Sequence, residues 1–141
     1  MTEVETRVIE QTIRIAAAPE IVWRHWVESE RLTAWFGRAE LDPRPGGQCR
    51  IEMEEGPVML GECVELVPYE RVVFTFGWEG NAPDQVGPGF THVEITLVPD
   101  GDETVLTLRH AEMPVTHAGD HEQGWAHYLP ILAERAGSAA G

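Results

Sequence analysis

The spacing of apolar residues divides the chain into a first strand, two helices, a run of strands and a closing helix. β-Branched residues are frequent in residues 4–15 and predict the first strand. Ile21 and Trp26 then recur at helical spacing behind Pro19, which is tolerated in a first helical turn. The sequence SERLTAWFG, residues 29–37, predicts a second short helix, with a serine as its cap and a glycine at its end.

Alternation of apolar and polar residues then predicts five further strands. They are expected at residues 48–54, 58–67, 72–78, 90–98 and 104–110. Turn sequences rich in Gly, Pro and Asp separate them, so consecutive strands should pair as an antiparallel meander. The longest connection, residues 80–89, has Gly and Pro at both ends; it is a candidate lid over a binding site, or a plain hairpin connection.

The closing segment GWAHYLPILAER, residues 124–135, has the spacing of an amphipathic helix. Pro130 in a helix interior would remove a backbone hydrogen bond, at about 3 kcal/mol, and kink the helix. If the helix instead begins near Trp125, the proline lies in a tolerated first turn. We expect a single domain over residues 1–136 and a flexible tail over residues 137–141.

Composition and charge narrow the classes of partner. The chain has 141 residues, 43% of them hydrophobic, which is enough for one core. With 24 acidic and 10 basic residues the formal charge is -14, which disfavours nucleic acid and anionic membrane surfaces as partners. No signal-peptide pattern or apolar stretch of membrane-spanning length is visible, and there are only two cysteines, so a soluble cytoplasmic protein is predicted. No cofactor motif is recognisable.

Four segments together resemble one known family. They are APEIVWRHWVESERLTAWFG, DPRPGGQCRIEM, GECVELVPYERVVFTFGW and GWAHYLPILAER. In this order, from about Thr6 to about Arg135, the chain resembles the activator-of-heat-shock-ATPase-like family of the START-like, or SRPBCC, superfamily. The resemblance implies an α+β helix-grip fold: a curved antiparallel sheet around a long C-terminal helix, with two short helices at one end. A cavity often lies between sheet and helix in this fold.

Five tryptophans are many for this length, and together with the implied cavity they predict a site for a small, largely apolar or aromatic molecule. The expected lining is Trp23, Trp35, Ile51, Met53, Phe74, Phe76, Ile95, Leu108, His110, Trp125, Tyr128, Leu129 and Leu132. Polar tips on His110, Tyr128 and the indole of Trp23 or Trp35 would orient the ligand. The alternative is that the rings simply fill the core.

Histidines are the candidates for further chemistry. By alternation after Leu106 and Leu108, His110 faces the concave side of the sheet, as a general base, a ligand-orienting donor or a hydrogen-bonded core residue. His117 and His121 have a spacing that can hold zinc on a helix, but no third ligand is positioned, so no metal site is predicted.

The two cysteines are expected to be neighbours. If Glu54 pairs with Val58 across the turn EEGPV, the register places Cys49 opposite Cys63. We expect two buried, reduced thiols.

The resemblance also implies other functions. One is an enzyme of the polyketide cyclase/aromatase type, or a lyase or hydrolase, that uses the same cavity, with His110 as the candidate catalytic residue. Another is a cofactor of a chaperone ATPase, or a different protein-interaction domain. The eukaryotic co-chaperone carries a separate N-terminal domain that contacts the chaperone, and this chain shows only one domain, so ligand binding is the favoured hypothesis. A second copy of the chain is also a candidate partner, as a homodimer.

Overall fold

The computed structural model describes residues 6–53, 56, 58–79 and 91–140. The elements in chain order are β1 (Thr6–Ile15), α1 (Pro19–Val27), α2 (Ser29–Thr33), β2 (Arg38–Leu41), β3 (Gln48–Glu52), β4 (Val58–Val67), β5 (Arg71–Phe76), β6 (Thr91–Asp100), β7 (Glu103–Pro114) and α3 (Val115–Ala140). The predicted order of strand, two helices, strands and closing helix is confirmed. No helix in the described ranges is long and apolar enough to cross a lipid bilayer.

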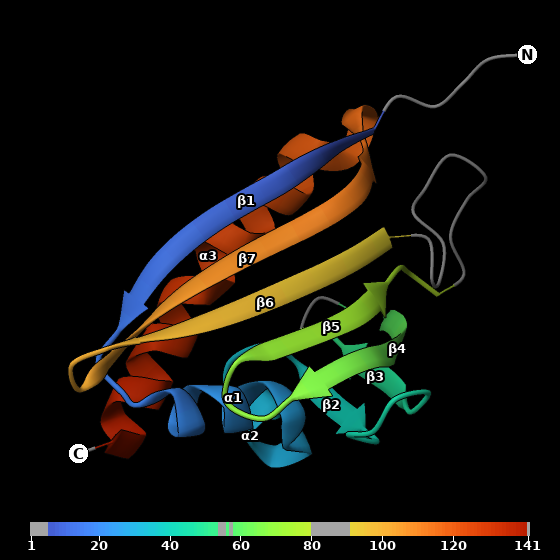
Figure 1. Ribbon diagram of the computed structural model, residues 1–141. Helices are drawn as coiled ribbons and strands as arrows, with labels where there is room; N and C mark the ends of the chain where they lie inside the picture. The colour runs from blue at the N-terminus through green and yellow to red at the C-terminus, as the bar shows by residue number, and fades with distance from the viewer. Residues whose placement is uncertain (1–5, 54–55, 57, 80–90, 141) are drawn as a thin grey trace, which may run out of the picture.

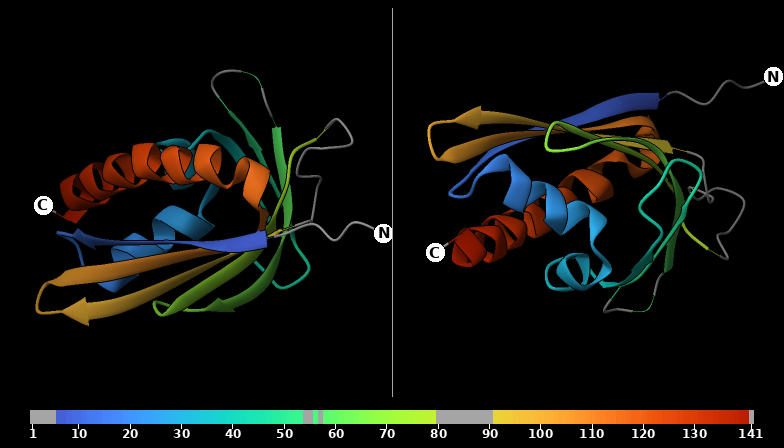
Figure 2. Two further views of the ribbon diagram at one scale, coloured as in Figure 1. Left: turned by 90° about the horizontal axis from the view of Figure 1, so that it is seen from above. Right: turned by 60° about the horizontal axis from the view of Figure 1, so that its bottom comes forward.

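The strands form one antiparallel sheet in the order β1-β7-β6-β5-β4-β3-β2. The sheet curves around α3, which runs along its concave face (Figures 1 and 2). The two short helices lie at the end of the sheet near the C-terminus of α3 (Figure 1). This is the predicted helix-grip arrangement, in which each layer buries the apolar face of the other.

The sheet and α3 pack together through the apolar face that each of them presents to the other. On β6, Val93, Ile95 and Leu97 are buried and alternate with half-buried polar residues. The buried residues of α3 recur mostly every three or four positions, and they are Ala118, Trp125, Leu129, Leu132 and Ala136. A stripe on the helix therefore packs on one face of the sheet, and this packing forms the core.

The structure differs from the prediction in several elements. α2 ends at Thr33 rather than residue 37, β3 at Glu52 rather than residue 54, and β5 at Phe76 rather than residue 78. β2 was not predicted, because four residues are too few for alternation to be recognised. α3 begins at Val115, so Pro130 lies in the helix interior and the first-turn alternative is wrong. The helix also includes residues 137–140, for which the predicted flexibility stays a prediction.

The predicted register of the two cysteines is wrong by two residues. Cys49 pairs with Gly61, because β3 already ends at Glu52 and Glu52 pairs with Val58. The turn is longer than expected, with the Gly56 N–H donating to the Met53 carbonyl at 3.0 Å. Both thiols are buried and unoxidised, as predicted, and burial raises the pKa of Cys49 to about 12.

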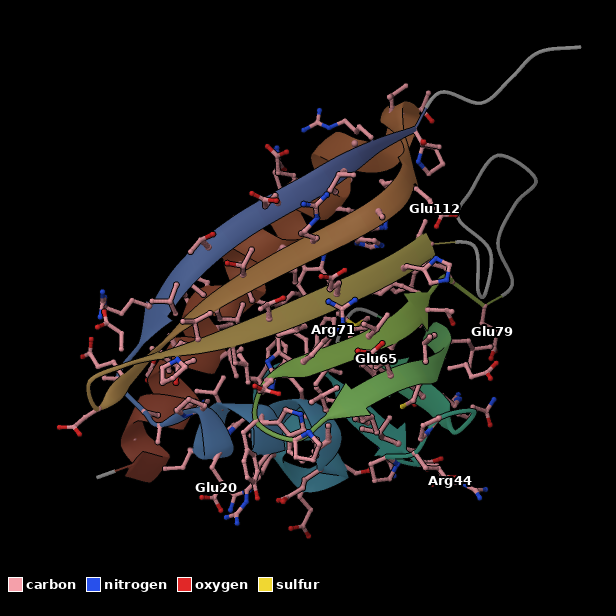
Figure 3. The ribbon with its side chains drawn as sticks, in the orientation of Figure 1. Glu20, Arg44, Glu65, Arg71, Glu79 and Glu112 are labelled. Atoms are coloured by element: carbon pink, nitrogen blue, oxygen red, sulfur yellow. The ribbon has the colours of Figure 1, made fainter. Side chains whose placement is uncertain are left out.

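A β-bulge near the end of β7 changes which side chains face the core. Arg7 pairs with Met113 and Ile9 with His110, so β7 has one more residue than β1 between these pairs. Glu112, in this bulge, has a positive φ of 65°. The extra residue turns Met113 into the core and leaves Glu112 exposed, where Figure 3 labels it at the end of β7.

The close approach of β4 and β5 gives a test of the packing. A Cβ on Gly61 would lie 1.9 Å from the Thr75 carbonyl oxygen, a backbone atom that cannot move away without disturbing β5. We expect Gly61→Ala to lower the free energy of unfolding by about 3 kcal/mol, measured by urea denaturation. The matched control is Gly119→Ala on α3, where the added Cβ meets no atom within 4 Å. It should stabilise the protein by about 0.5–1 kcal/mol through helix propensity. Equal stability of the two variants would contradict the described β4–β5 contact.

Candidate functional site

A cavity of about 200 Å³ lies between α3, the end of β5 and the segment after α2. Five aromatic residues line it: Phe36, Phe76, Trp78, Trp125 and Tyr128. The rest of the lining consists of Met53, Asp120, His121 and Gly124. We call this space the aromatic cavity. Its walls are almost entirely apolar, and the N-terminal half of α3 contributes the polar side chains of Asp120 and His121.

The periodicities of two elements create the lining. On α3, His121, Gly124 and Tyr128 follow at intervals of three and four, so they share the face that looks onto the sheet. Phe76 and Trp78 alternate at the end of β5, with ring centroids 5.3 Å apart. Gly124 contributes no side chain, and a Cβ built there would have no atom within 4 Å. The cavity therefore lies where the helix omits a side chain.

The volume fits one aromatic ring with short substituents. An apolar cavity of about 150 Å³ admits a molecule of the size of benzene. Phe36 forms part of the wall, with its centroid 5.3 Å from that of Trp125 and 5.1 Å from that of Tyr128. Rings at these separations and tilted angles form a rigid, water-poor surface suited to another ring.

A second, more polar space adjoins the aromatic cavity. It has a volume of about 500 Å³, and Phe36, Met53 and Tyr128 line both spaces. Its other lining residues include Thr33, Trp35, Arg38, Glu52 and His127. We call it the polar hollow. The shared residues show that the two spaces are neighbours.

The expected lining residues divide into several groups. Met53, Phe76, Trp125 and Tyr128 line the aromatic cavity, and Trp35 lines the polar hollow. Ile51 and Phe74 border a void of only about 10 Å³. Four of the expected residues belong to the core and line neither the aromatic cavity nor the polar hollow, and they are Ile95, Leu108, Leu129 and Leu132. Trp23 packs edge-on against the exposed Tyr69, with centroids 5.6 Å apart.

Sequence reasoning missed Phe36, Trp78, Asp120, His121 and Gly124 as lining residues. The signal for the last three was the helical spacing to Tyr128, but it is useful only once the helix is known to begin at Val115. The expected lid, residues 80–89, lies outside the described residues.

His110 is completely buried and belongs to a chain of hydrogen bonds. The indole Nε1–H of Trp125 donates to Nδ1 of His110 at 3.0 Å. Because indole can only donate, Nδ1 is the acceptor, and the proton of the neutral ring is on Nε2. Nε2–H then donates to the Thr91 hydroxyl at 2.7 Å, which donates to the Phe76 carbonyl at 2.7 Å. Both ring nitrogens are thus occupied inside the protein.

This environment keeps His110 neutral. Burial lowers the pKa of His110 to about 3, and the nearby His121 and His92 add to the effect. A general base needs an accessible lone pair and a pKa near the working pH. The geometry therefore favours the hydrogen-bonded core residue among the alternatives for His110, in which it holds the indole of Trp125 in the cavity wall.

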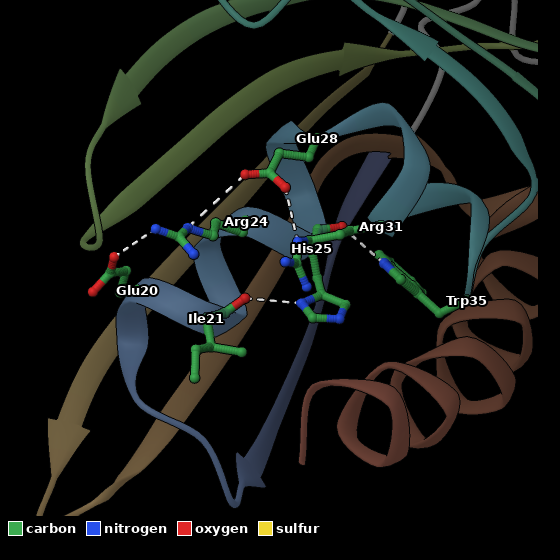
Figure 4. Close-up of polar contacts among 7 residues, drawn as sticks. All are labelled: Glu20, Ile21, Arg24, His25, Glu28, Arg31 and Trp35. Atoms are coloured by element: carbon green, nitrogen blue, oxygen red, sulfur yellow. Dashed lines mark hydrogen bonds and ion pairs between the residues drawn. The ribbon is translucent and has the colours of Figure 1, made fainter. Parts of the chain in front are cut away.

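The indole N–H of Trp35 also forms a hydrogen bond within the protein. Its Nε1–H donates to the His25 carbonyl at 2.8 Å, and Nδ1 of His25 lies 2.8 Å from the Ile21 carbonyl (Figure 4). The indole N–H that was expected to orient a ligand instead fastens the segment after α2 to α1.

His121 lies at the edge of the aromatic cavity. Its Nε2 accepts a hydrogen bond from Nε1–H of Trp78 at 3.0 Å, which joins α3 to the end of β5. Within the described ranges, no group of three or more His, Cys, Asp or Glu side chains could hold a metal ion. The side chain of His117 lies outside the described residues.

The buried neutral histidine predicts a pH dependence of stability. Between pH 6.5 and about 3 the unfolded chain binds a proton at position 110 that the folded chain does not, so stability falls as the pH falls. The loss should approach about 1.4 kcal/mol per pH unit. We expect His110→Gln to have a lower free energy of unfolding than the wild type at pH 7. Between pH 6 and pH 4, however, its free energy of unfolding, measured by urea denaturation, should fall less steeply with pH.

The control is His127→Gln, at an exposed position. In this variant the free energy of unfolding should depend on pH as it does in the wild type. If His110→Gln does not fold, the imidazole signals of the wild-type protein decide the matter by NMR. A titration of His110 near pH 6.5 would contradict the described hydrogen-bond chain.

Comparison with known proteins identifies the family. A family model described as "Activator of Hsp90 ATPase homolog 1-like protein" matches residues 16–137. A search of curated proteins finds no match. An "AHSA1-like protein" from Rhizobium etli is similar over 100% of this chain and 88% of its own, with 35% sequence identity and a TM-score of 0.74.

Two further solved structures share the fold. A protein from Mesorhizobium loti has a TM-score of 0.83 at 20% identity, over 92% of this chain and 96% of that one. An Aha1 dimer from Colwellia psychrerythraea has a TM-score of 0.75 at 20% identity, over 96% of this chain and 99% of that one. The homodimer expected for this chain stays a prediction. The matched residues span most of the chain, which therefore belongs to the Activator of Hsp90 ATPase homolog 1-like family.

Proposed function

We propose that this protein binds a small aromatic or apolar molecule in the aromatic cavity. The observation that carries the proposal is an open volume of about 200 Å³ lined by aromatic rings, at the place where α3 has a glycine. A glycine in a helix interior destabilises the helix by about 1 kcal/mol relative to alanine. An alanine side chain at position 124 would have room, so packing does not explain the glycine, whereas space for a ligand does.

The expected affinity is moderate. Burial of roughly 200 Å² of apolar ligand surface contributes about 5 kcal/mol at 25 cal/mol per Å². Association opposes this gain through lost translational and rotational freedom. A one-ring ligand without polar contacts should therefore bind no more tightly than roughly 0.2 mM.

The alternative functions are less well supported. Catalysis through His110 would need a lone pair that Trp125 already occupies. A chaperone cofactor would need a large exposed apolar patch. Among the described residues, the exposed large apolar side chains are instead spread over β1, β4, the β4–β5 turn, β6 and α3, and they are Val8, Val64, Tyr69, Val98 and Val115.

Filling the cavity from the helix tests the proposal. Gly124→Leu would place a side chain in the space that a ligand ring requires. With p-cresol as the probe, we expect saturable quenching of tryptophan fluorescence in the wild-type protein and at least about tenfold weaker binding in Gly124→Leu.

The matched control is Gly119→Leu, five residues earlier on an exposed face of the same helix, which should bind as the wild type does. Circular dichroism establishes that both variants fold. Equal affinity of p-cresol for a folded Gly124→Leu protein would show that the aromatic cavity is not the site.

A further inference from the structure

The arginines of this protein are almost all neutralised. Its ten basic residues are all arginines, and eight of them lie within 3.8 Å of a carboxylate. Arg71, for example, lies between Glu65 at 2.9 Å and Glu94 at 2.8 Å on the outer face of the sheet (Figure 3). Arg24 similarly contacts Glu20 at 2.7 Å (Figure 4). With 24 acidic residues available, a paired arginine is the normal state here.

Two arginines differ, Arg38 and Arg135. Among the described residues neither has a carboxylate within ion-pair distance. Arg135 is exposed near the C-terminus of α3 and lines neither cavity. Arg38 lines the polar hollow. A guanidinium that has no carboxylate partner among the described residues, beside a cavity in a protein of charge -14, is a ready site for an external anion.

The surroundings of Arg38 leave it as the main donor of the polar hollow. Glu52 is its partner across the β2–β3 ladder, but the Glu52 carboxylate lies 3.8 Å from Nη1 of Arg50 on its own strand. The Thr33 hydroxyl is engaged by the backbone, because it donates to the Ser29 carbonyl and accepts from the Ala39 N–H. His127 also lines the polar hollow, and as a cation it would also favour an anion.

The position of Arg38 relative to the aromatic cavity defines a class of ligand. Phe36, Met53 and Tyr128 line both spaces, so a molecule that extends from one space into the other would have one end among aromatic rings and the other near Arg38. We infer that the ligand is an aromatic carboxylic acid, with its ring in the aromatic cavity and its carboxylate on Arg38. The planar guanidinium suits a carboxylate, to which it can donate two parallel hydrogen bonds. This inference rests on the proposed function and adds the chemistry of the polar end.

Pairs of ligands that differ only in charge test the inference. Phenylacetate, 3-phenylpropionate and 5-phenylpentanoate are each compared with the alcohol of the same length by isothermal titration calorimetry. Three spacers are used so that one unsuitable length does not decide the result. For the best spacer, we expect the acid to bind at least about tenfold more tightly than its alcohol, as a charge-assisted hydrogen bond should give.

Three variants test whether Arg38 causes the preference for the acid over the alcohol. Arg38→Gln should bring the acid to the affinity of the alcohol and leave the alcohol unchanged, and Arg38→Lys should retain part of the preference. Arg135→Gln removes the same charge from the only other described arginine without an ion pair, and it should bind as the wild type does.

The outcomes separate this inference from the proposed function. Equal affinity of acids and alcohols in the wild type would overturn the role of the carboxylate but leave the aromatic cavity as a site. A preference for acids that persists in Arg38→Gln would overturn the role of Arg38. If no acid or alcohol binds and p-cresol does not bind either, the proposed function itself fails.

Discussion

The hydrogen-bond chain from Trp125 through His110 and Thr91 to the Phe76 carbonyl is the interaction on which the site depends. Each of its members comes from a different element, namely α3, β7, β6 and β5. All three side chains are buried, so each donor or acceptor would lose hydration without a replacement if one member were removed. The chain therefore fixes the rotation of α3 against the sheet as well as the position of one indole.

That rotation decides where the cavity lies. With Trp125 held by His110, the neighbouring Gly124 lies against the open space, and His121 reaches Trp78 at the end of β5. A helix turned by one residue would present other side chains to the sheet. The volume is thus a consequence of a polar interaction in the core rather than of poor packing, since the neighbouring leucines of α3 are fully packed.

The outer surface has a different organisation. Ion pairs between exposed arginines and carboxylates contribute little to stability individually. Their importance here is that they occupy nearly all the positive charge of a strongly acidic protein. Among the described residues, Arg38 and Arg135 are the arginines without such a partner, and Arg38 also lies beside a cavity. The site is therefore distinguished by chemistry as well as by shape.

Much of the fold could be predicted from the sequence, because its signals are local. Alternation over residues 90–98 and 104–110 identified β6 and β7 and placed His110 on the concave face, and this side-chain direction depends only on the two-residue period of a strand. β2 is the strand that was not predicted, because four residues are too few to show alternation. It is recognised only by its pairing with β3 in the structure. The lining of the site was predicted less well, since Phe74 and Leu108 share a face with true lining residues but lie in the packed core.

The sequence by itself determined the order of elements and the apolar character of the interior, because periodicity and composition act along the chain, and its resemblance to a known family implied the helix-grip fold. The tertiary structure alone decided the β3–β4 register, the change of phase at Glu112, the start of α3 and the positions of the cavities. These features depend on contacts between residues far apart in sequence. The reason Gly61 must be a glycine is a carbonyl on β5, and the reason Trp125 faces the cavity is a histidine on β7.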